Sequence, residues 1–199
     1  METSRRNWTD LPVRALLFAG FCAFVVLFAL NSGSVRLPGG PLDELGNGFS
    51  GVQPVGVPFS AGLFALDNRG GRTLKIDAVR LGPHTRGLEL LGVRAYGGGR
   101  GSIAFLRGFP PRRWPPSPRR PKLSFIHGLE IRLHGRKQLV VGLRVGHPGR
   151  FVLRGLDVAY RVHYLFGLPV PYRRHITMVM VVCAGPDARR TPCKPPSSG

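Results

Sequence analysis

The amino-acid sequence predicts a mainly β protein, in which a β-sandwich follows a single transmembrane helix near the N-terminus. Three observations support this prediction. An uncharged apolar run covers residues 15–30. Several later segments alternate apolar and polar residues with a period of two. The 28 Gly and 19 Pro of the 199 residues fall mostly between these segments, as in a domain of short strands and turns.

The apolar run is hydrophobic on all sides, so it suits lipid better than one face of a protein core. Extended to residue 35 it would be roughly 30 Å long as a helix, which matches the hydrocarbon core of a bilayer. Arg5, Arg6 and Arg14 precede the run, whereas only Arg36 lies within the next twenty residues. The positive-inside rule therefore predicts a cytoplasmic basic head at 1–14, a signal-anchor helix at 15–35 and an extracytoplasmic remainder.

Two alternatives compete with the anchor. A cleaved signal peptide needs small residues at its cleavage site, and Ser32 and Ser34 form only a weak one. A buried core helix would need other helices around it, and the sequence predicts none. Cys22 lies inside the run, where it acts as a small hydrophobic residue, with palmitoylation as the alternative.

The predicted β domain covers residues 59–184, between a Gly/Pro-rich linker with an edge strand (36–58) and a C-terminal tail (185–199). Its strongest strand is 156–164, where Leu156, Val158 and Tyr160 alternate with polar or small residues. Residues 138–146 repeat the pattern, and 174–183 becomes apolar on both faces, as in a central strand. Weaker patterns predict strands at 59–67, 73–81, 88–96, 101–106 and 123–133.

Turn residues separate these segments at 68–71, 82–83, 97–99, 147–149 and 167–169. About seven to nine short strands at this spacing predict a sandwich of immunoglobulin-like kind, with a small β-barrel as the alternative. The segment 149–160 is similar to the loop-to-strand corner of such domains, where a tyrosine, here Tyr160, closes the turn. The Cys…Trp…Cys spacing of antibody domains is absent, since Trp8 and Trp114 lie outside the predicted strands.

The order of these parts resembles single-pass membrane proteins of high-GC bacteria that carry an exported immunoglobulin-like sandwich. The shared features are a short basic head, one helix, and a sandwich whose first hairpin has an Asn-x-Gly turn, here at Asn68 to Gly70. The resemblance is architectural. It implies a location in the cell membrane with the N-terminus in the cytoplasm, and it brings no function with it.

The net charge of +19 is carried mainly by 25 Arg, against four Lys and ten acidic residues. Such a balance indicates a polyanionic partner, although codon bias in a GC-rich genome explains the preference for Arg over Lys equally well. The charge is densest in a predicted insertion at 107–122, which has six Pro, six basic residues and no acid. Its predicted polyanion-binding residues are Arg107, Arg112, Arg113, Trp114, Arg119, Arg120 and Lys122.

Two cysteines lie outside the apolar run, Cys183 at the end of the last predicted strand and Cys193 in the tail. Export would place them where disulfides persist, so we expect them to pair. The alternative is two free thiols in a frayed tail.

Motifs for catalysis and cofactors are missing from the sequence, so we expect no enzyme, no cofactor and no bound metal. The six His form no His-x-His or His-Glu-x-x-His pair, and His163 and His175 on neighbouring strands are the best candidates if a metal site exists. No Gly-x-Ser-x-Gly motif occurs, and the Gly-rich segment 97–101 lacks the Lys and helix of a phosphate loop.

Two functional hypotheses remain. The first is an anchored structural or protein-interaction module of the cell envelope that has an envelope protein as its partner. The second is a binder of anionic lipid headgroups or wall polymers through the Arg/Pro-rich insertion. Predicted export leaves nucleic acid out of reach as a partner.

Overall fold

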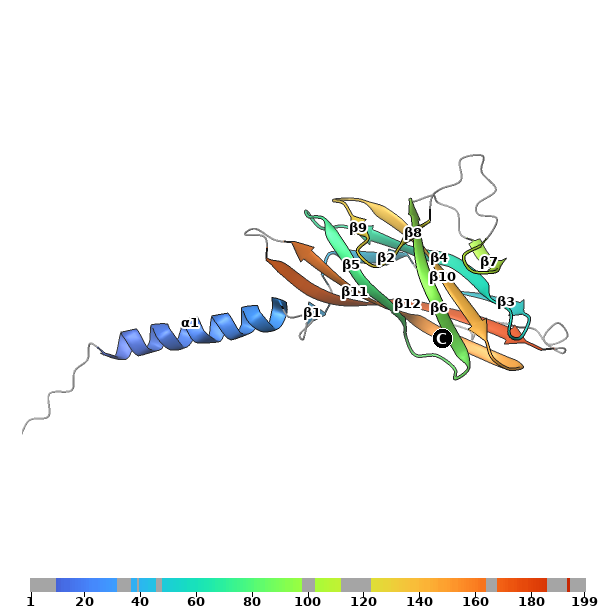
Figure 1. Ribbon diagram of the computed structural model, residues 1–199, viewed down its shortest axis with the longest axis horizontal. Helices are drawn as coiled ribbons and strands as arrows, with labels where there is room; N and C mark the ends of the chain where they lie inside the picture. The colour runs from blue at the N-terminus through green and yellow to red at the C-terminus, as the bar shows by residue number, and fades with distance from the viewer. Residues whose placement is uncertain are drawn as a thin grey trace, which may run out of the picture.

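A computed structural model describes residues 10–31, 37–38, 40–45, 48–97, 103–111, 123–163, 168–185 and 193 (Figure 1). It contains one helix, α1 (Asp10–Asn31), within these ranges. The strands are β1 (Leu37–Pro38), β2 (Leu42–Leu45), β3 (Phe49–Gln53), β4 (Phe59–Asn68), β5 (Leu74–Leu81), β6 (Leu88–Gly97), β7 (Ile103–Arg107), β8 (Ser124–Phe125), β9 (Glu130–Ile131), β10 (Arg136–Val145), β11 (Gly149–His163) and β12 (Pro169–Ala184).

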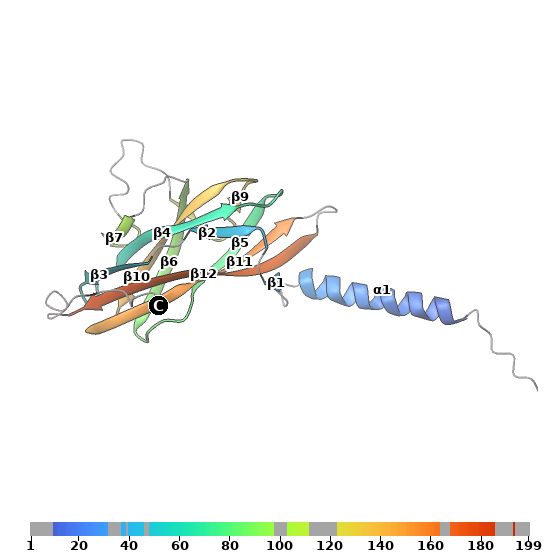
Figure 2. The same ribbon diagram turned by 180° about the vertical axis from the view of Figure 1, so that it is seen from behind.

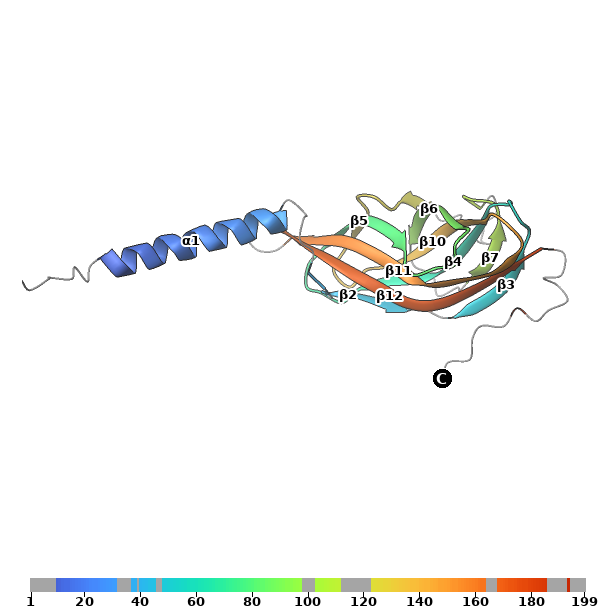
Figure 3. The ribbon, with the colours of Figure 1, turned by 90° about the horizontal axis from the view of Figure 1, so that it is seen from below.

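Helix α1 has 22 residues and begins five residues before the apolar run. Pro12 lies in its first turn, where a missing backbone N–H breaks no helical hydrogen bond. The side chains of residues 15–28 are exposed, and α1 extends away from one end of the sandwich (Figure 3). Within the described part of the chain, no helix is both long enough and apolar enough to cross a membrane. A helix covers the apolar run, although it spans Asp10–Asn31 and not the predicted 15–35. This finding gives no support to a membrane span, which stays a prediction.

The strands form two six-stranded sheets that pack face to face. One has the order β1-β12-β11-β5-β9, with β3 also paired to β12, and the other has the order β2-β4-β10-β6-β8, with β7 also paired to β4. Apart from the short added strands, this divides the chain as an immunoglobulin fold does, with β2, β4, β10 and β6 facing β5, β11 and β12. The sheets share no strand pairing in the described ranges, so the structure is a sandwich and not the alternative small barrel.

The predicted linker at 36–58 contributes three short strands to the sandwich. β1 and β3 pair in parallel with β12 near its two ends, whereas β2 between them pairs with β4 in the opposite sheet (Figure 2). The chain thus crosses twice between the sheets, and the edge strand that the sequence predicted is divided among three pieces. Because β1 pairs near the start of β12, α1 lies next to that end of the sandwich (Figure 1).

The core lies between the two sheets and is built from the inward side of each alternating strand. Its largest fully buried residues include Tyr160, Phe59 and Phe151. Tyr160 does not close a corner, as the sequence had predicted, because residues 149–163 form one continuous strand. Its hydroxyl instead accepts a hydrogen bond from the backbone N–H of Leu42 in β2 (3.4 Å) and its ring stacks on Tyr172.

Two other predictions about strands are wrong. Residues 123–133 form the two short strands β8 and β9, which pair with different sheets. The Asn68 turn is no hairpin, because β4 and β5 belong to different sheets. Buried Asn68 closes the crossing by donating from Nδ2 to the carbonyls of Arg72, Ile131 and Arg132, at 2.8 to 3.0 Å.

Candidate functional site

The outward side of β5, β11 and β12 is a polar sheet face, which we call the open face. Alternation along each strand sends every second side chain outward, and here these are mostly charged or small. The side chains that matter to the site are Lys75, Ala78, Arg80, Asp157, Ala159, Arg161, Arg173 and His175.

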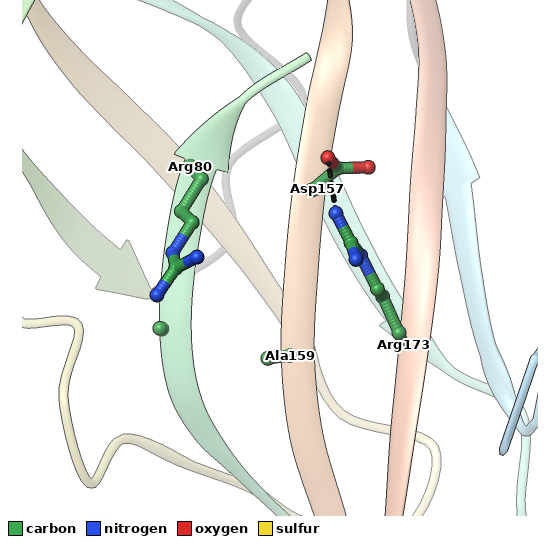
Figure 4. Close-up of a pocket in the computed structure, with 5 residues that line it drawn as sticks. Arg80, Asp157, Ala159 and Arg173 are labelled. Carbon is green, nitrogen blue, oxygen red and sulfur yellow. Dashed lines mark hydrogen bonds and ion pairs between the residues drawn. The ribbon is translucent and has the colours of Figure 1, made fainter. Parts of the chain in front are cut away.

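Strand register brings these residues into rows across the face. Asp157 lies opposite Arg80 on one side and His175 on the other. In the next row Ala159 lies opposite Ala78 and Arg173. The two alanines leave a hollow of about 130 Å³ that is lined by Ala78, Arg80, Asp157, Ala159 and Arg173 (Figure 4).

Asp157 organises one wall of this hollow. Its carboxylate accepts hydrogen bonds from Arg173 Nη2 (2.9 Å) and from His175 Nδ1 (3.0 Å). Partial burial acts to raise the pKa of Asp157, but the hydrogen bonds from His175 and Arg173 and the charge of Arg173 outweigh it, so this pKa lies below its ordinary value. Asp157 therefore stays ionised and holds the Arg173 guanidinium at the edge of the hollow.

The basic side chains around the hollow outnumber the acids. Arg161 forms an ion pair with Asp77 (2.8 Å), and Arg173 forms one with Asp157 (2.9 Å). Lys75 and Arg80 have no ion pair with any residue that the structure describes. Glu130 on β9 lies opposite Lys75, so four basic groups share this face with three carboxylates, and the small excess of positive charge favours an anion.

The outward side of β4, β10 and β6 is different, and we call it the covered face. β7 and β8 extend this sheet at its two edges, the ring of Phe109 lies over its middle, and Tyr96, Val140, Leu106 and Leu123 build a small second core on this side. The ring of Phe109 lies on Gly142 and Gly92, where any Cβ atom would collide with or press against it. Arg94 lies over the ring of Phe125, with Cζ 3.9 Å from the centroid.

Polar groups under this cover are hydrogen-bonded. The Tyr96 hydroxyl donates to Gln138 Oε1, and Gln138 Nε2 donates to the carbonyl of Gly62 at 2.5 Å. Burial raises the pKa of Tyr96, so its hydroxyl remains a donor. Ser60 Oγ donates to the carbonyl of Gly108 at 2.5 Å and fixes the start of the covering segment.

Of the predicted polyanion-binding residues, the structure describes Arg107. It is exposed at the end of β7, beside a hollow that is also lined by Val57, Pro58 and Phe109. The others lie outside the described residues: Arg112, Arg113, Trp114, Arg119, Arg120 and Lys122. Both described flanks of this segment pack on the covered face through Phe109 and Leu123.

Cys183 and Cys193 are joined by a disulfide, with their Cα atoms 5.9 Å apart. The bond ties residue 193 back to the end of β12. Cys193 Sγ lies 3.4 Å from the carbonyl oxygen of Gly51, so the tie also reaches β3 at the sheet edge. Cys22 of α1 is a free and exposed cysteine.

The register separates the two histidines proposed for a metal site. His163 lies opposite Pro169, whereas His175 lies opposite Asp157, so they are six residues apart along the strands, or roughly 20 Å. No group of three potential metal ligands occurs among the described residues.

Sequence reasoning missed the open-face hollow. Its clearest signal was Ala159, a small residue among the charged outward positions of 157–163. Its partner Ala78 could not be identified, because a register shift between Ala159 and Tyr160 decides which β5 residue lies opposite.

No protein-family model matches the chain, and no curated protein matches it. Among solved structures, the chain is similar to a PapD-like domain of human CEP192 (PapD-like domain 7), with a TM-score of 0.37 and 12% identity over 76% of this chain and 89% of that one. It is also similar to a family 123 glycoside hydrolase from Clostridium perfringens, with a TM-score of 0.32 and 9% identity over 66% of this chain and 23% of that one. Likenesses at these scores carry no argument, and the fold assignment rests on the strand order.

Proposed function

We propose that the protein is a membrane-anchored, extracytoplasmic β-sandwich that binds a protein partner of the cell envelope through its open face, without catalytic activity. The observation that carries this proposal is the contrast between the two outer faces. The middle of one is packed under the ring of Phe109, beside the small second core, and the other presents exposed charged side chains in ordered rows. Sheet faces of this kind offer fixed side-chain positions to a partner.

The anchor rests on α1. Its described side chains include Leu16, Phe18 and Phe21, each at least 65% exposed, which is costly in water and favourable in lipid. Residues 15–28 cover roughly 21 Å, so a span of roughly 30 Å requires the remainder of the 22-residue helix as well. Five residues join α1 to β1, at most roughly 20 Å of chain, so an inserted helix would hold the sandwich close to the membrane.

The anchor is tested by two reporter fusions in cells. A reporter active only outside the cytoplasm should be active after Gly199 and silent after Arg6. The chain should also stay in the membrane fraction after alkaline carbonate washing, because an integral helix resists it. Release by carbonate, or the reverse reporter pattern, would show that the anchor or its orientation is wrong.

The open face is tested by photocrosslinking in intact membranes. A photoreactive amino acid at Lys75 or His175 should give an adduct with a discrete partner. The same amino acid at Leu91 or Arg144, on the other side of the sandwich, provides the matched control and should give none. Adducts from the control positions alone would move the interface to the covered face.

A second function, the binding of anionic lipid headgroups or wall polymers by the Arg/Pro-rich insertion, keeps one specific observation in its favour. Phe109 and Leu123, described residues on either side of 112–122, both pack on the covered face. Replacing Arg112, Arg113, Arg119 and Arg120 by Gln should then abolish salt-sensitive binding of the full chain to an immobilised anionic wall polymer. Unchanged binding would exclude the insertion as the site.

A further inference from the structure

We infer that the hollow over Ala78 and Ala159 receives a carboxylate side chain from an acidic segment of the partner, held between Arg80 and Arg173. This inference rests on the proposed function, because it names the chemistry by which the open face would recognise its partner. Three features of the hollow carry it: its floor, its cations and its shape.

The floor is made by a pair of small residues that face each other across two strands. Ala159 and Ala78 are direct partners in the register of β11 and β5. Both are half-buried although they point outward, because longer side chains stand around them. Two methyl groups side by side form an apolar patch about as wide as the methylene stem of a Glu or Asp side chain.

The cations stand on opposite sides of this floor. Arg173 on β12 is held by Asp157, whereas Arg80 on β5 has no hydrogen bond or ion pair with any described residue (Figure 4). Strands neighbour each other at about 4.8 Å, so the backbones that carry the two guanidinium groups lie roughly 10 Å apart. A carboxylate placed between them could accept hydrogen bonds from Arg80 in the two-pronged geometry that guanidinium favours.

The shape indicates a peptide side chain more than a free ion. The hollow is open to the outside and combines an apolar floor with a charged rim, so the stem and the head of a carboxylate side chain both find a surface. Lys75, the other basic residue without an ion pair among the described residues, lies five residues before Arg80 on the same strand. An acidic segment that runs along β5 could therefore meet a second cation roughly 16 Å away.

The test uses the full chain in nanodiscs of neutral lipid and a fluorescein-labelled hexaglutamate peptide as the probe, with anisotropy as the readout. Arg80→Gln should weaken binding about tenfold, the loss of one charge-assisted contact. Ala159→Leu, which fills the hollow, should weaken it by a similar factor. Arg154→Gln, which removes an exposed arginine on the neighbouring strand β11 from the same face outside the hollow, is the matched control and should change affinity less than about twofold.

Several outcomes would overturn the inference. One is absence of binding by the unmodified chain, and another is equal weakening by Arg80→Gln and Arg154→Gln, which would mean attraction by general charge. Displacement of the peptide by an equal concentration of inorganic phosphate would indicate a site for a small anion. Loss of binding when the four arginines at 112, 113, 119 and 120 become Gln would move the site to the insertion.

Folding and the proposed function are controlled separately. Arg80 is exposed, so Arg80→Gln should unfold at the temperature of the unmodified chain even if Ala159→Leu does not. Crosslinks from Lys75 and His175 together with an unaffected Arg80→Gln variant would keep the open-face function and refute the carboxylate site. Peptide binding that depends on Arg80 without any crosslinked partner would refute the function and keep the site.

Discussion

The two outer faces of the sandwich have similar middle strands, but one face is covered in its middle and the other is open. β10 is the central strand of one sheet and carries Gly142 on its outward side, and β11 is central in the other and carries Ala159. The ring of Phe109 occupies the space over Gly142, whereas the space over Ala159 stays open. A small outward residue therefore marks either a packed contact or a vacant site, and only its three-dimensional neighbours distinguish the two.

The largest expected effect comes from adding the same side chain to both middle strands. Gly142→Val should lower the free energy of unfolding by about 3 kcal/mol, because any Cβ there collides with the Phe109 ring. Ala159→Val should change it by less than about 0.5 kcal/mol, since the hollow has room. Denaturant unfolding of the two variants measures the difference. Equal effects would mean that the two faces are packed alike.

The next largest effect is expected from the disulfide, which lies at the edge of the open-face sheet. Cys183 and Cys193 close a loop with a separation of 10 residues, so Cys193→Ser should cost about 2 to 3 kcal/mol by the chain-entropy model. Reductant should destabilise the unmodified chain to the same degree and leave the variant unchanged. Alkylation of the denatured chain without reductant should label Cys22 alone. Full labelling of all three cysteines would contradict the pairing.

Phe109→Ala tests how far the cover itself stabilises the sandwich. Phe109 is half-buried on the glycines, so its loss should cost about 2 kcal/mol, less than a fully buried phenylalanine would. Phe125→Ala is the control, because that ring is 70% exposed and should contribute no more than about 0.5 kcal/mol. If the two variants unfold at the same denaturant concentration, the segment rests on the sheet without supporting it.

The smallest effect concerns Asp157 on the open face. Because its folded pKa is depressed, its contribution to stability is present above the unfolded value of about 4 and is lost as pH falls through the lower folded value. Its partners are exposed, so Asp157→Asn should cost less than about 1 kcal/mol at neutral pH and nothing near pH 2. A difference between variant and unmodified chain that persists at pH 2 would show that the ionised carboxylate is not its source.

The sequence predicted the strands best where one face is buried. The alternation at 156–164 and 138–146 follows directly from the period-two geometry of a strand in a sandwich, and β11 and β10 include residues 156–163 and 138–145. The strand predictions failed where the paired strands are short or far apart in the sequence. The three pieces β1, β2 and β3 are held by β12 and β4, more than a hundred and about twenty residues away, and their own residues carry no pattern long enough to reveal it.

The candidate site was beyond sequence reasoning for a related reason. The densest charge lies at residues 107–122, and such local charge density is visible in a linear sequence. The cations of the open face lie on three strands, with Arg80 and Arg173 separated by 93 positions in the chain. They come together only through the pairing of β5, β11 and β12.

By itself, the sequence determined the class of this protein: an apolar helix, then alternating strands, with two cysteines near enough in the chain for a short loop to join them. These are local properties, since burial of one strand face or of a whole helix leaves its period in consecutive residues. Only the tertiary structure decided that the space over Gly142 is filled and the space over Ala159 is vacant. The reason is that a bulge shifts every later side chain relative to the neighbouring strand. The hollow beside Arg80 exists through the register at Ala159, and no stretch of sequence records that register.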